Sequence, residues 1–480
     1  MDVALLSRIQ FAVTVGFHFL FPPITIGLAW LLLVVETLGW RTGQPVYGNI
    51  GRFFAKLLGL TFAVGVATGV VMEFQFGTNW ARYSKFVGDI FGAPLAAEAI
   101  FAFFLESVFL GLYLFARDRI SRKLHWFSIL MVAIGSTLSA FWIIVANSWM
   151  QTPAGFTITP LRPDIPAYVP GMCIDPALYR AELTNFWQAV FNPSTIIRYV
   201  HTVTASVVCG AFFMAGAAAY ILLRSTRKAD PSQPTGPAVI ALAQRALGIS
   251  LLVGLVFSIM VAFPSGHHHA KQIARLQKEK FAAIEGLYTT QSGGRPLVMF
   301  ALPFTEPPHL KARIEIPNML SLMAFGDINA HIPGIDQFPK ENIPPLWLTF
   351  VSFHNMVALG MLFIAAATFG TVEYYRGALF GKRGFLWLLV CMVPLPLAAC
   401  QFGWVVAEVG RQPWIVYGLM RTSDAFSANL SAGQVLFSLL LFSSIYLALL
   451  ALYFKVLFHK LHHVPATLAP TPTPPTLAHP

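Results

Sequence analysis

The chain has 480 residues, of which 56% are hydrophobic and only 11% are charged. A typical soluble domain carries about 25% charged residues, so this composition excludes an ordinary soluble protein and indicates one that crosses a membrane several times. The net charge of +11 could suggest nucleic acid as a partner, and whether it does depends on where the basic residues lie.

Nine apolar stretches follow one another along the chain, each about as long as the ~20 residues that cross a bilayer as a helix. They lie near 12–38, 54–76, 95–116, 127–149, 198–223, 243–263, 346–370, 386–408 and 434–458. We therefore expect an all-α membrane protein with about nine transmembrane helices. The N-terminal run has Asp2 before Arg8 and no clear cleavage site, which predicts a retained first span rather than a signal peptide.

These spans divide the chain into four parts. Residues 1–263 hold six spans and residues 346–458 hold three. Residues 264–345 are polar, and we expect them to be the only large extramembrane segment. Residues 459–480 end in the Pro/Thr-rich sequence PATLAPTPTPPTLAHP, whose low complexity predicts a disordered tail.

The basic residues decide the predicted orientation. One set of loops carries 16 lysines and arginines against three acidic residues, Asp118, Asp230 and Glu373. Loops rich in Lys and Arg are typically cytoplasmic, so we expect this set and the C-terminus inside, and the N-terminus and the 264–345 loop outside. The net charge therefore reports topology and gives no indication of nucleic acid. The basic residues of this set are Arg41, Arg52, Lys56, Arg117, Arg119, Arg122, Lys123, Arg224, Arg227, Lys228, Arg245, Arg376, Lys382, Arg383, Lys455 and Lys460.

The four cysteines give no sign of a cofactor site. They are Cys173, Cys209, Cys391 and Cys400. They form no C-x-x-C pair, and three of them lie in apolar runs, so we expect packing thiols rather than a disulfide framework or a cysteine metal site.

Several side chains inside the spans could bind a cofactor. His18 lies just before two prolines, which should kink the first helix because proline has no N–H to donate. His201 opens the fifth span, and His354 and Met356 lie in the seventh. A lone histidine is as often a hydrogen-bonded core residue, and a lone methionine is usually packing. An imidazole and a thioether together, however, are a known axial pair for haem iron.

Depth makes these residues informative as a group. Glu408 lies near the outer end of the eighth span and is followed by Arg411, and taken alone the two predict a salt bridge at the interface. Scattered structural polar residues would not collect at one depth, so we expect a buried site. The residues that fall in the outer half of the bilayer, given the predicted orientation, are His18, Glu98, His201, His354, Met356 and Glu408.

Two glutamates occupy one apolar run, APLAAEAIFAFFLESVFLGLYLF. An acidic side chain at the centre of a bilayer costs roughly 2.5 to 3.5 kcal/mol, so Glu98 and Glu106 need a reason to be there. Glu106 lies eight residues beyond Glu98, about 12 Å deeper along a helix, and both can face the same interior. Protonatable groups leading inward from a buried site indicate a proton path, and the alternative is two neutral, hydrogen-bonded carboxyl groups.

Long motifs carry a resemblance to a known family. They are LSRIQFAVTVGFHFLFPPITIGLAW, FAVGVATGVVMEFQFGTNW, GDIFGAPLAAEAIFAFFLES, LSAFWIIVANSWMQ, RYVHTVTASVVCGAFF and VVAEVGRQPW. With them, the chain resembles subunit I of cytochrome bd-type quinol oxidases over most of its length. The short loop between the sixth and seventh spans resembles that of the cyanide-insensitive type.

The resemblance implies roles for individual residues. His201 and Met356 would be the axial ligands of the low-spin haem b, and His18 and Glu408 would be ligands of two high-spin haems. Glu98 and Glu106 would belong to the di-haem site and its proton route. The loop segment LQKEKFAAIEG matches the quinol-binding segment, which implicates Lys280 and Glu285. Arg411 falls in the GRQPW signature, and Trp404 is the aromatic residue four positions before Glu408.

The resemblance also implies cofactors, partners and a location. The cofactors would be two haem b and either haem d or a third haem b. The enzyme would oxidise membrane quinol, ubiquinol or menaquinol, reduce dioxygen to water, and build proton motive force by charge separation without pumping. Subunit II would be the partner, with room for a small single-helix subunit, and the location would be the inner (cytoplasmic) membrane of a bacterium.

The chain departs from the family at one position and leaves one motif unexplained. His354 stands two residues before Met356, where the family often has arginine, so it could compete with Met356 as a ligand. The triplet His267–His269 could bind a stray metal, but three adjacent imidazoles do not easily face one ion, and we expect a solvated loop.

Three other classes of membrane protein fit the sequence less well. A haem–copper oxidase needs several histidines around copper, and the spans offer only His18, His201 and His354. A proton-coupled secondary transporter is the alternative function, but no inverted repeat relates the two halves of the chain. A non-catalytic membrane scaffold would not explain the common depth of the polar residues.

Overall fold

The structure is a computed structural model that describes residues 2–172, 174–225, 236–291, 293–305 and 308–464. Cys173, Arg227, Lys228, Asp230 and the Pro/Thr-rich end from 465 to 480, on which some expectations depend, lie outside the described residues. Within the described part, nine helical segments are long and apolar enough to cross a membrane. This confirms the predicted all-α membrane fold.

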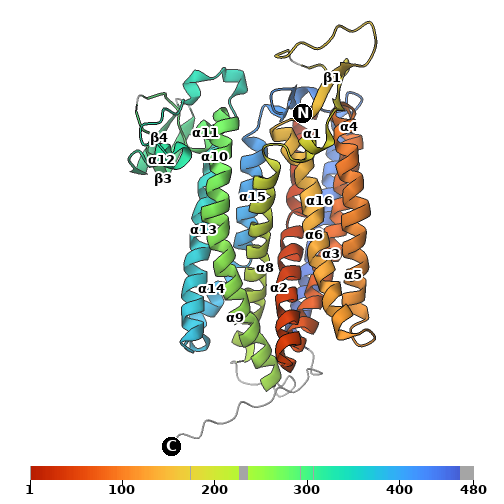
Figure 1. Cartoon of the computed structure of the whole chain (residues 1–480), viewed down its shortest axis with the longest axis vertical. Helices are drawn as coiled ribbons and strands as arrows, with labels where there is room; N and C mark the ends of the chain where they lie inside the picture. Colours follow the sequence, from red (N-terminus) through yellow and green to blue (C-terminus); the bar gives the residue numbers. More distant parts are fainter. Residues whose placement is uncertain (1, 173, 226–235, 292, 306–307, 465–480) are drawn as a thin grey trace, which may run out of the picture.

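The spans form one upright bundle (Figure 1). We call the end where α1 begins the upper end. In chain order the spans are α1 with α2 (Val3–His18, Pro22–Thr42), α3 (Pro45–Thr78), α4 with the π-helical turn η1 and α5 (Ala81–Ala97, Glu98–Phe103, Phe104–Phe115), α6 (Arg122–Gln151), α8 (Thr195–Ser225), α9 with the π-helical turn η2 and α10 (Pro237–Met260, Val261–Ser265, Gly266–Leu276), α13 (Leu346–Tyr375), α14 with α15 (Arg383–Met392, Pro394–Val409) and α16 (Ala432–His462).

Prolines lie at or beside every interruption within a span. The predicted kink after His18 is confirmed, because α1 ends there and α2 begins at Pro22. Pro94 precedes η1, Pro264 lies inside η2, and Pro394 begins α15. A proline cannot donate a backbone hydrogen bond and its ring clashes with the preceding turn, so the helix breaks or widens there.

Helix α8 lies at the centre of the bundle. Its most apolar stretch is 94% buried, far more than that of any other span in the described residues. It crosses α2 at Gly27 and Gly210, where a Cβ on Gly27 would lie only 2.3 Å from the carbonyl oxygen of Ser206. Glycines at both sides of a crossing let two backbones touch, which is how membrane helices pack most tightly. The helix that carries His201 is therefore fixed by the core.

The upper end carries three extramembrane regions. Between α11 (Lys278–Ile284) and α13 lie the hairpin of β3 (Leu297–Thr305) and β4 (Pro308–Ile316) and the short helix α12 (Met319–Phe325). A second hairpin, β1 (Phe156–Pro160) with β2 (Tyr179–Leu183), and α7 (Phe186–Val190) lie between α6 and α8. Strands β5 (Trp414–Val416) and β6 (Met420–Arg421) follow α15. The expectation that 264–345 is the only large extramembrane segment was wrong.

Two predicted boundaries are also corrected. The sixth span continues as α10 to Leu276, so residues 264–276 are helical and the loop begins later than residue 264. Helix α16 continues to His462, so the first residues of the expected disordered tail, 459–462, are helical. In both places a loss of hydrophobicity was read as the end of the helix, whereas a helix can continue beyond the apolar part of the bilayer.

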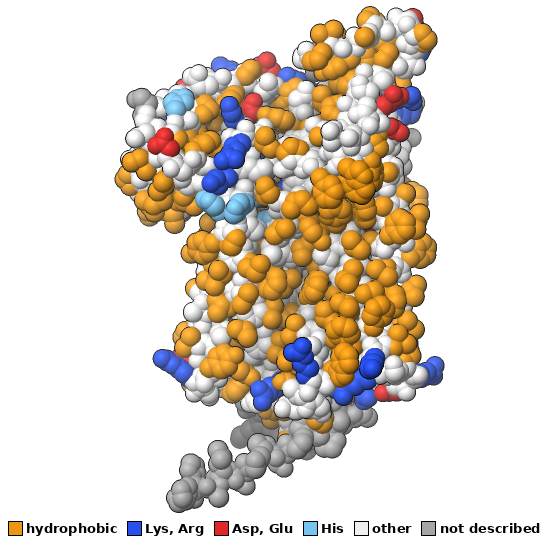
Figure 2. Space-filling view, in the orientation of Figure 1, with side chains coloured by type: hydrophobic (Ala, Val, Ile, Leu, Met, Phe, Trp, Pro, Cys, Tyr) orange, Lys and Arg blue, Asp and Glu red, His pale blue; other side chains and the backbone are white. Residues whose placement is uncertain are grey.

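Basic side chains gather at one end of the apolar surface of the bundle. Figure 2 shows a broad hydrophobic band across this face of the bundle, with Lys and Arg side chains gathered at its lower edge. Near that lower end Arg117 pairs with Glu36 at 3.0 Å, and Arg52 pairs with Asp118 at 3.0 Å. The basic residues thus flank the band at one end, as expected for residues that set topology.

Candidate functional site

One large cavity runs through the upper part of the bundle. Its volume is 1990 Å³, well above the ~1,000 Å³ upper end of ordinary small-molecule sites. It therefore has room for more than one large group. Every site residue expected from the sequence lines it: His18, Glu98, Glu106, His201, Lys280, Glu285, Met356, Trp404, Glu408 and Arg411.

His18 ends α1 and is held by α3. Its Nδ1 lies 3.0 Å from the hydroxyl of Thr68. That hydroxyl lies 3.0 Å from the carbonyl oxygens of both Val64 and Gly65, so its proton goes to the backbone and its oxygen can accept from Nδ1–H. The Nε2 atom of His18 then has no proton, which is the form that ligates a metal. Gly69 leaves room for the ring, because a Cβ there would lie 3.1 Å from Cε1 of His18.

His201 and Met356 reach the cavity from two different helices. His201 projects from α8, and its Nδ1 lies 2.8 Å from the hydroxyl of Ser265 in η2. An Nδ1–H donated to that hydroxyl again leaves Nε2 free for a metal. Met356 projects from α13 toward α15, where its sulfur would lie 3.0 Å from a Cβ on Gly403. The imidazole and thioether expected as a ligand pair therefore line one cavity.

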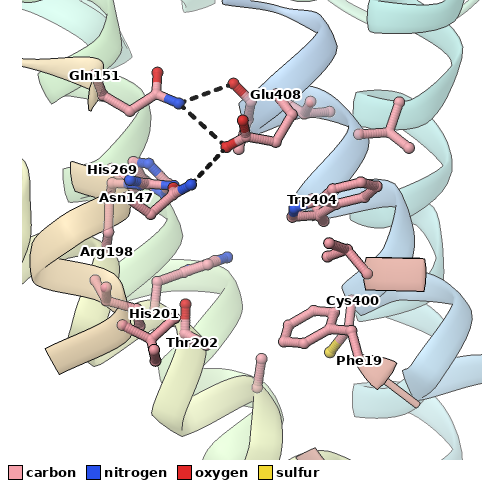
Figure 3. A pocket seen from close by; sticks show the side chains of 18 of the residues that line it. Phe19, Asn147, Gln151, Arg198, His201, Thr202, His269, Cys400, Trp404 and Glu408 are labelled. Atoms are coloured by element: carbon pink, nitrogen blue, oxygen red, sulfur yellow. Dashed lines mark hydrogen bonds between the residues drawn. The ribbon is translucent and has the colours of Figure 1, made fainter. Parts of the chain in front are cut away.

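The histidine triplet does not lie in a solvated loop, so that expectation was wrong. His267, His268 and His269 form the first turn of α10. The ring of His269 packs edge-on against that of His201, with 5.3 Å between their centroids. Figure 3 shows both rings on the same side of the cavity, opposite Trp404. A helix rather than a loop follows η2, and it turns His269 inward.

Glu408 is the acceptor at the centre of a polar network. Its Oε1 accepts from Asn147 at 2.9 Å and lies 3.5 Å from Nε2 of Gln151 (Figure 3). Its Oε2 accepts from Arg411 at 2.5 Å. Asn147 also accepts from Arg198, which lies one turn before His201 on α8. Arg411 is 3% exposed, and its Nη1 has no hydrogen-bond partner among the described residues. The expected salt bridge is present, and one buried guanidinium N–H is left to bind an anionic group.

Lys280 joins the same network from outside the membrane spans. Its ammonium group donates to Gln151 at 2.7 Å, to Gln277 at 2.8 Å and to the carbonyl oxygen of Ala407 at 3.2 Å. Three neutral acceptors hold it although the side chain is only 4% exposed. Burial lowers the pKa of Lys280 well below its usual value, and the nearby cations Arg198 and Arg411 lower it further. Burial therefore makes the charged form of Lys280 less stable than it would be in water.

Glu285 caps the end of α11 and is 3% exposed. Burial raises the pKa of its carboxyl group from 4.5 to about 8. Its Oε2 has no hydrogen-bond partner among the described residues. A buried carboxyl group that titrates near neutrality, with one oxygen unused at a cavity wall, is suited to proton exchange with a ligand.

Glu98 and Glu106 lie at the far wall of the cavity. Glu98 begins η1 and accepts from the hydroxyl of Ser139 at 2.7 Å, and Glu106 is 6% exposed on α5. A π-helical turn holds one residue more than an α-helical turn, so the step of eight residues from Glu98 to Glu106 turns the helix about as far as seven α-helical residues would. The angle between the two side chains is then within about 20° of two full turns. The turn thus brings both carboxyl groups nearly onto one face, closer than a regular helix would.

Sequence reasoning missed several residues of the site. Arg198 and Glu73 are charged residues inside apolar runs, and this signal was available in the sequence. Glu73 lines the cavity from α3 beside Glu98 and is exposed at the side of the bundle. Asn147, Gln151 and Gln277 could not be found in this way, since uncharged amides in a helix are common and only their contacts reveal them.

His354 lies against backbone rather than free in the cavity. Its Nδ1 is 3.0 Å from the carbonyl oxygen of Phe350, and its Nε2 is 3.1 Å from the carbonyl oxygen of Val298 in β3. Its ring stacks on that of Phe350, with 3.9 Å between centroids. Both nitrogens face carbonyl oxygens, and whichever carries the proton donates to the backbone, so the ring is turned toward backbone and the arrangement favours Met356 over His354 as the donor from α13.

Comparisons with known proteins show the family of the chain. The family model of cytochrome bd terminal oxidase subunit I matches residues 6–465. The chain is 36% identical over 461 residues to cytochrome bd ubiquinol oxidase subunit 1 of Bacillus subtilis, covering 94% of this chain and 92% of that protein. It is 34% identical to cytochrome bd-II ubiquinol oxidase subunit 1 of Escherichia coli, covering 93% of each.

A solved structure shares the fold. The bd oxidase of Geobacillus thermodenitrificans superposes with a TM-score of 0.84 at 30% sequence identity, covering 97% of this chain and 99% of that one. Members of this family carry haem and work as quinol:oxygen oxidoreductases in respiratory electron transport, and the name subunit I implies a partner subunit in the complex. The chain belongs to the cytochrome bd terminal oxidase subunit I family, and it is a multi-pass membrane subunit of a terminal quinol oxidase.

Proposed function

We propose that this subunit oxidises membrane quinol at Lys280 and Glu285, passes the electrons to haem groups held in the cavity, and supplies protons through Glu98 and Glu106 for the reduction of dioxygen to water. The observation that carries the proposal is that one cavity is lined by all of these groups together with two histidines, a methionine and a glutamate. The proposal extends the family assignment to individual residues of this chain.

The donor set of the cavity fits haem. His201 and Met356 would hold a low-spin haem b, and His18 and Glu408 would each hold a high-spin haem, the third being haem d or a further haem b. Bound haem iron supplies one-electron transfer and, where a coordination position stays open, a site for dioxygen. Thr68 and Ser265 support these roles, because each fixes the Nδ1 side of a ligating imidazole. The unused N–H of Arg411 is suited to a haem carboxylate.

Quinol oxidation needs a base for each hydroxyl proton, and Glu285 is suited to that role. Its pKa of about 8 makes it a stronger base than a surface carboxylate while leaving part of it ionised near neutral pH. Lys280 would donate to a quinol oxygen in exchange for one of its three present acceptors, Gln151, Gln277 or the carbonyl of Ala407. The amide network of Gln151 links Lys280 to the neighbourhood of Glu408 within a few hydrogen bonds, so substrate and cofactors would lie close together.

Protons for water would come from the opposite side. We place the upper end outside and the lower, basic end in the cytoplasm of a bacterium, which makes the chain a protein of the inner (cytoplasmic) membrane with its N-terminus outside. Glu106 lies deeper than Glu98, so it would take protons from the cytoplasm and pass them to Glu98 and Ser139. Release of quinol protons outside and uptake of protons inside separates charge without a pump.

Division of labour along the chain follows from this assignment. Residues 1–263 would carry His18, His201 and the proton path, the loop up to residue 345 would bind quinol, and residues 346–458 would supply Met356 and Glu408. Subunit II, and a small single-helix subunit if one exists, would cover exposed helices. The chain gives no indication of nucleic acid as a partner, and either ubiquinol or menaquinol fits the site.

A visible difference spectrum of the purified complex, reduced minus oxidised and with or without carbon monoxide, tests the proposal. Haem b bands with a red-shifted chlorin band are expected if the third group is haem d. Haem b bands alone, part of them reactive with carbon monoxide, are expected if it is a third haem b. A folded, complete complex without haem would contradict the proposal and return attention to proton-coupled transport.

A further inference from the structure

The β3–β4 hairpin exposes a large apolar surface at the side of the bundle. Its strands pair antiparallel, with Leu297 opposite Ile316 and Phe304 opposite His309. Only a small part of it packs inward, where Val298 and Ala301 contact Phe350 of α13. The exposed apolar side chains of the hairpin are Met299 (55%), Phe300 (52%), Leu302 (49%), Phe304 (41%), Ile314 (64%) and Ile316 (40%). An exposed apolar surface of this kind marks a site of contact with a membrane or another protein.

The depth of the hairpin follows from its contact with α13. Glu373, buried near the lower end of α13 and facing Lys382 at 3.6 Å, marks the lower boundary of the apolar region. About 20 residues span the ~30 Å hydrocarbon layer, and counting back from Glu373 reaches Phe353 and His354. The carbonyl oxygen of Val298 lies 3.1 Å from Nε2 of His354. Strand β3 therefore lies at the upper boundary of the hydrocarbon, not above the membrane.

Neighbouring side chains also place the hairpin at the upper boundary of the hydrocarbon. Trp347 in the first turn of α13 is 54% exposed, and tryptophan is enriched at the membrane–water interface. Lys311 and Arg313 are exposed on β4, with Lys311 4.7 Å from the ring centroid of Phe304. Cations beside apolar side chains suit a surface that meets anionic lipid headgroups. Figure 2 shows hydrophobic side chains along the lower edge of the overhanging region that contains β3 and β4 in Figure 1.

A two-stranded hairpin cannot sink into the hydrocarbon itself. Both of its edges carry unpaired backbone groups, and these need water or headgroups as partners. An interfacial position satisfies both demands, because apolar side chains reach the acyl chains while the backbone stays hydrated.

The cavity opens beside the hairpin. Most of the residues that line the cavity lie inside the bundle, but a group of them is also exposed at its surface near β3. These residues are Met299, Met323, Leu348, Val357 and Met361, each between 39% and 55% exposed. Glu285, Phe281 and Lys280 line the same cavity further in. Three flexible methionine side chains at an opening can move aside for a long apolar chain.

We propose that the apolar face of the β3–β4 hairpin is seated in the outer leaflet of the bilayer, where it forms the upper rim of a side opening that admits a lipid-soluble substrate from the membrane. The position of the hairpin in the outer leaflet is inferred from the hairpin and its contacts alone. The role of the opening rests on the proposed quinol site at Lys280 and Glu285. A quinol carries an apolar tail, and an opening at the interface lets its head reach Glu285 while the tail stays among lipid chains.

The seat in the leaflet is tested by spin labels on the whole oxidase complex in vesicles of phosphatidylethanolamine and phosphatidylglycerol. Single cysteines replace Phe300 or Ile314 on the apolar face, and Lys311 or Glu315 serve as matched positions among the charged residues of the same hairpin. The parent carries Cys173→Ser and Cys391→Ser, and its residual label signal is subtracted. Collisions with dioxygen, which concentrates in lipid, are compared with those of a water-soluble nickel chelate.

Labels at 300 and 314 are expected to collide more with dioxygen than with nickel, and labels at 311 and 315 more with nickel. Strong nickel collisions at 300 and 314 would overturn the proposal, because the face would be in water. Protection from both reagents would overturn it in favour of a covering subunit. Dipolar broadening between labels would overturn it in favour of a second copy of this chain.

The opening is tested by kinetics with two quinols that share a headgroup, one with a long isoprenoid tail and one with no tail. The double variant Phe300→Glu, Ile314→Glu is expected to lower kcat/KM for the long-tailed quinol about tenfold, mainly through KM, and to leave the tail-less quinol unchanged. Lys340→Glu, at an exposed position outside the hairpin, is the charge control and should change neither. Equal kcat/KM of the double variant and the parent for the long-tailed quinol would overturn the opening. If the parent complex oxidised neither quinol, that result would instead refute the proposed quinol site.

Discussion

The hydroxyl of Ser265 lies 2.8 Å from Nδ1 of His201, which joins a π-helical turn of the sixth span to the histidine at the centre of the bundle. Pro264, the residue before Ser265, lies inside this turn. The local widening of the helix thus sets the position of a side chain that orients a ligand, a role in which π-helical turns are often found.

Replacing Ser265 with alanine should weaken the low-spin haem. An imidazole that loses its Nδ1 partner is less well oriented, and such a loss costs about 10- to 100-fold in metal affinity. The haem b content of the purified complex and the midpoint potential of the low-spin haem measure the effect. Ser258→Ala is the control, since the Ser258 hydroxyl is buried in α9 and has no hydrogen-bond partner among the described residues. An unchanged potential and haem content in Ser265→Ala would refute the orienting role.

Replacing Gly69 with alanine should disturb the site at His18. The added methyl group would lie 3.1 Å from Cε1 of His18, so the ring has to shift. The shift needed is a few tenths of an ångström. Because a misplacement near 1 Å can cost about 100-fold in rate, we expect this smaller shift to lower oxygen consumption about two- to tenfold. Gly77→Ala on the same helix meets no atom within 4 Å and should retain parental activity. The carbon monoxide difference spectrum should change in the first variant alone, and equal spectra would count against His18 as a ligand.

Replacing Glu106 with glutamine should slow turnover without removing haem. The amide keeps the shape of the side chain but cannot carry a proton, and loss of a positioned proton carrier costs about 10²- to 10⁴-fold. Oxygen consumption and the haem spectrum are measured on the same preparation. The control is Glu182→Gln in the β2 hairpin, where the carboxylate pairs with Arg180 at the surface. Normal oxidase rates in Glu106→Gln would remove Glu106 from the proton path.

The pH dependence of quinol oxidation should report Glu285. Its carboxyl group has a raised pKa of about 8, so below that pH it is mostly protonated and cannot accept a proton. We expect kcat/KM for quinol to rise about tenfold per pH unit below pH 8 and to level off above it. Glu285→Gln should give a low profile without that rise. Glu279→Gln, six residues earlier on α11, should keep it. A pH-independent parent would contradict the base role.

The sequence by itself determined the architecture and the family. Apolar runs near 20 residues can only be satisfied as helices in a membrane, because a lipid-exposed backbone must bond to itself. Candidate site residues were expected as well, since His18, His201 and the glutamates are out of place in apolar spans. The pairing of His201 with Met356 as ligands came from the resemblance to the family and stays a proposal. The membrane architecture and the family can be inferred in this way because they depend on composition, on local spacing and on motifs that can be read from the sequence.

Only the tertiary structure decided how the site is assembled. Ser265 and Thr68 become partners of histidines, and Gln151 joins Lys280 to Glu408, through contacts between residues 50 to more than 250 positions apart. The π-helical turn at Glu98 changed the relative angle of two glutamates that a regular helix would have set wrongly. The inward position of His269 and the interfacial position of the β3–β4 hairpin likewise depend on helix packing. Hydrogen bonds and depth are properties of distance in space, and distance along the chain does not encode them.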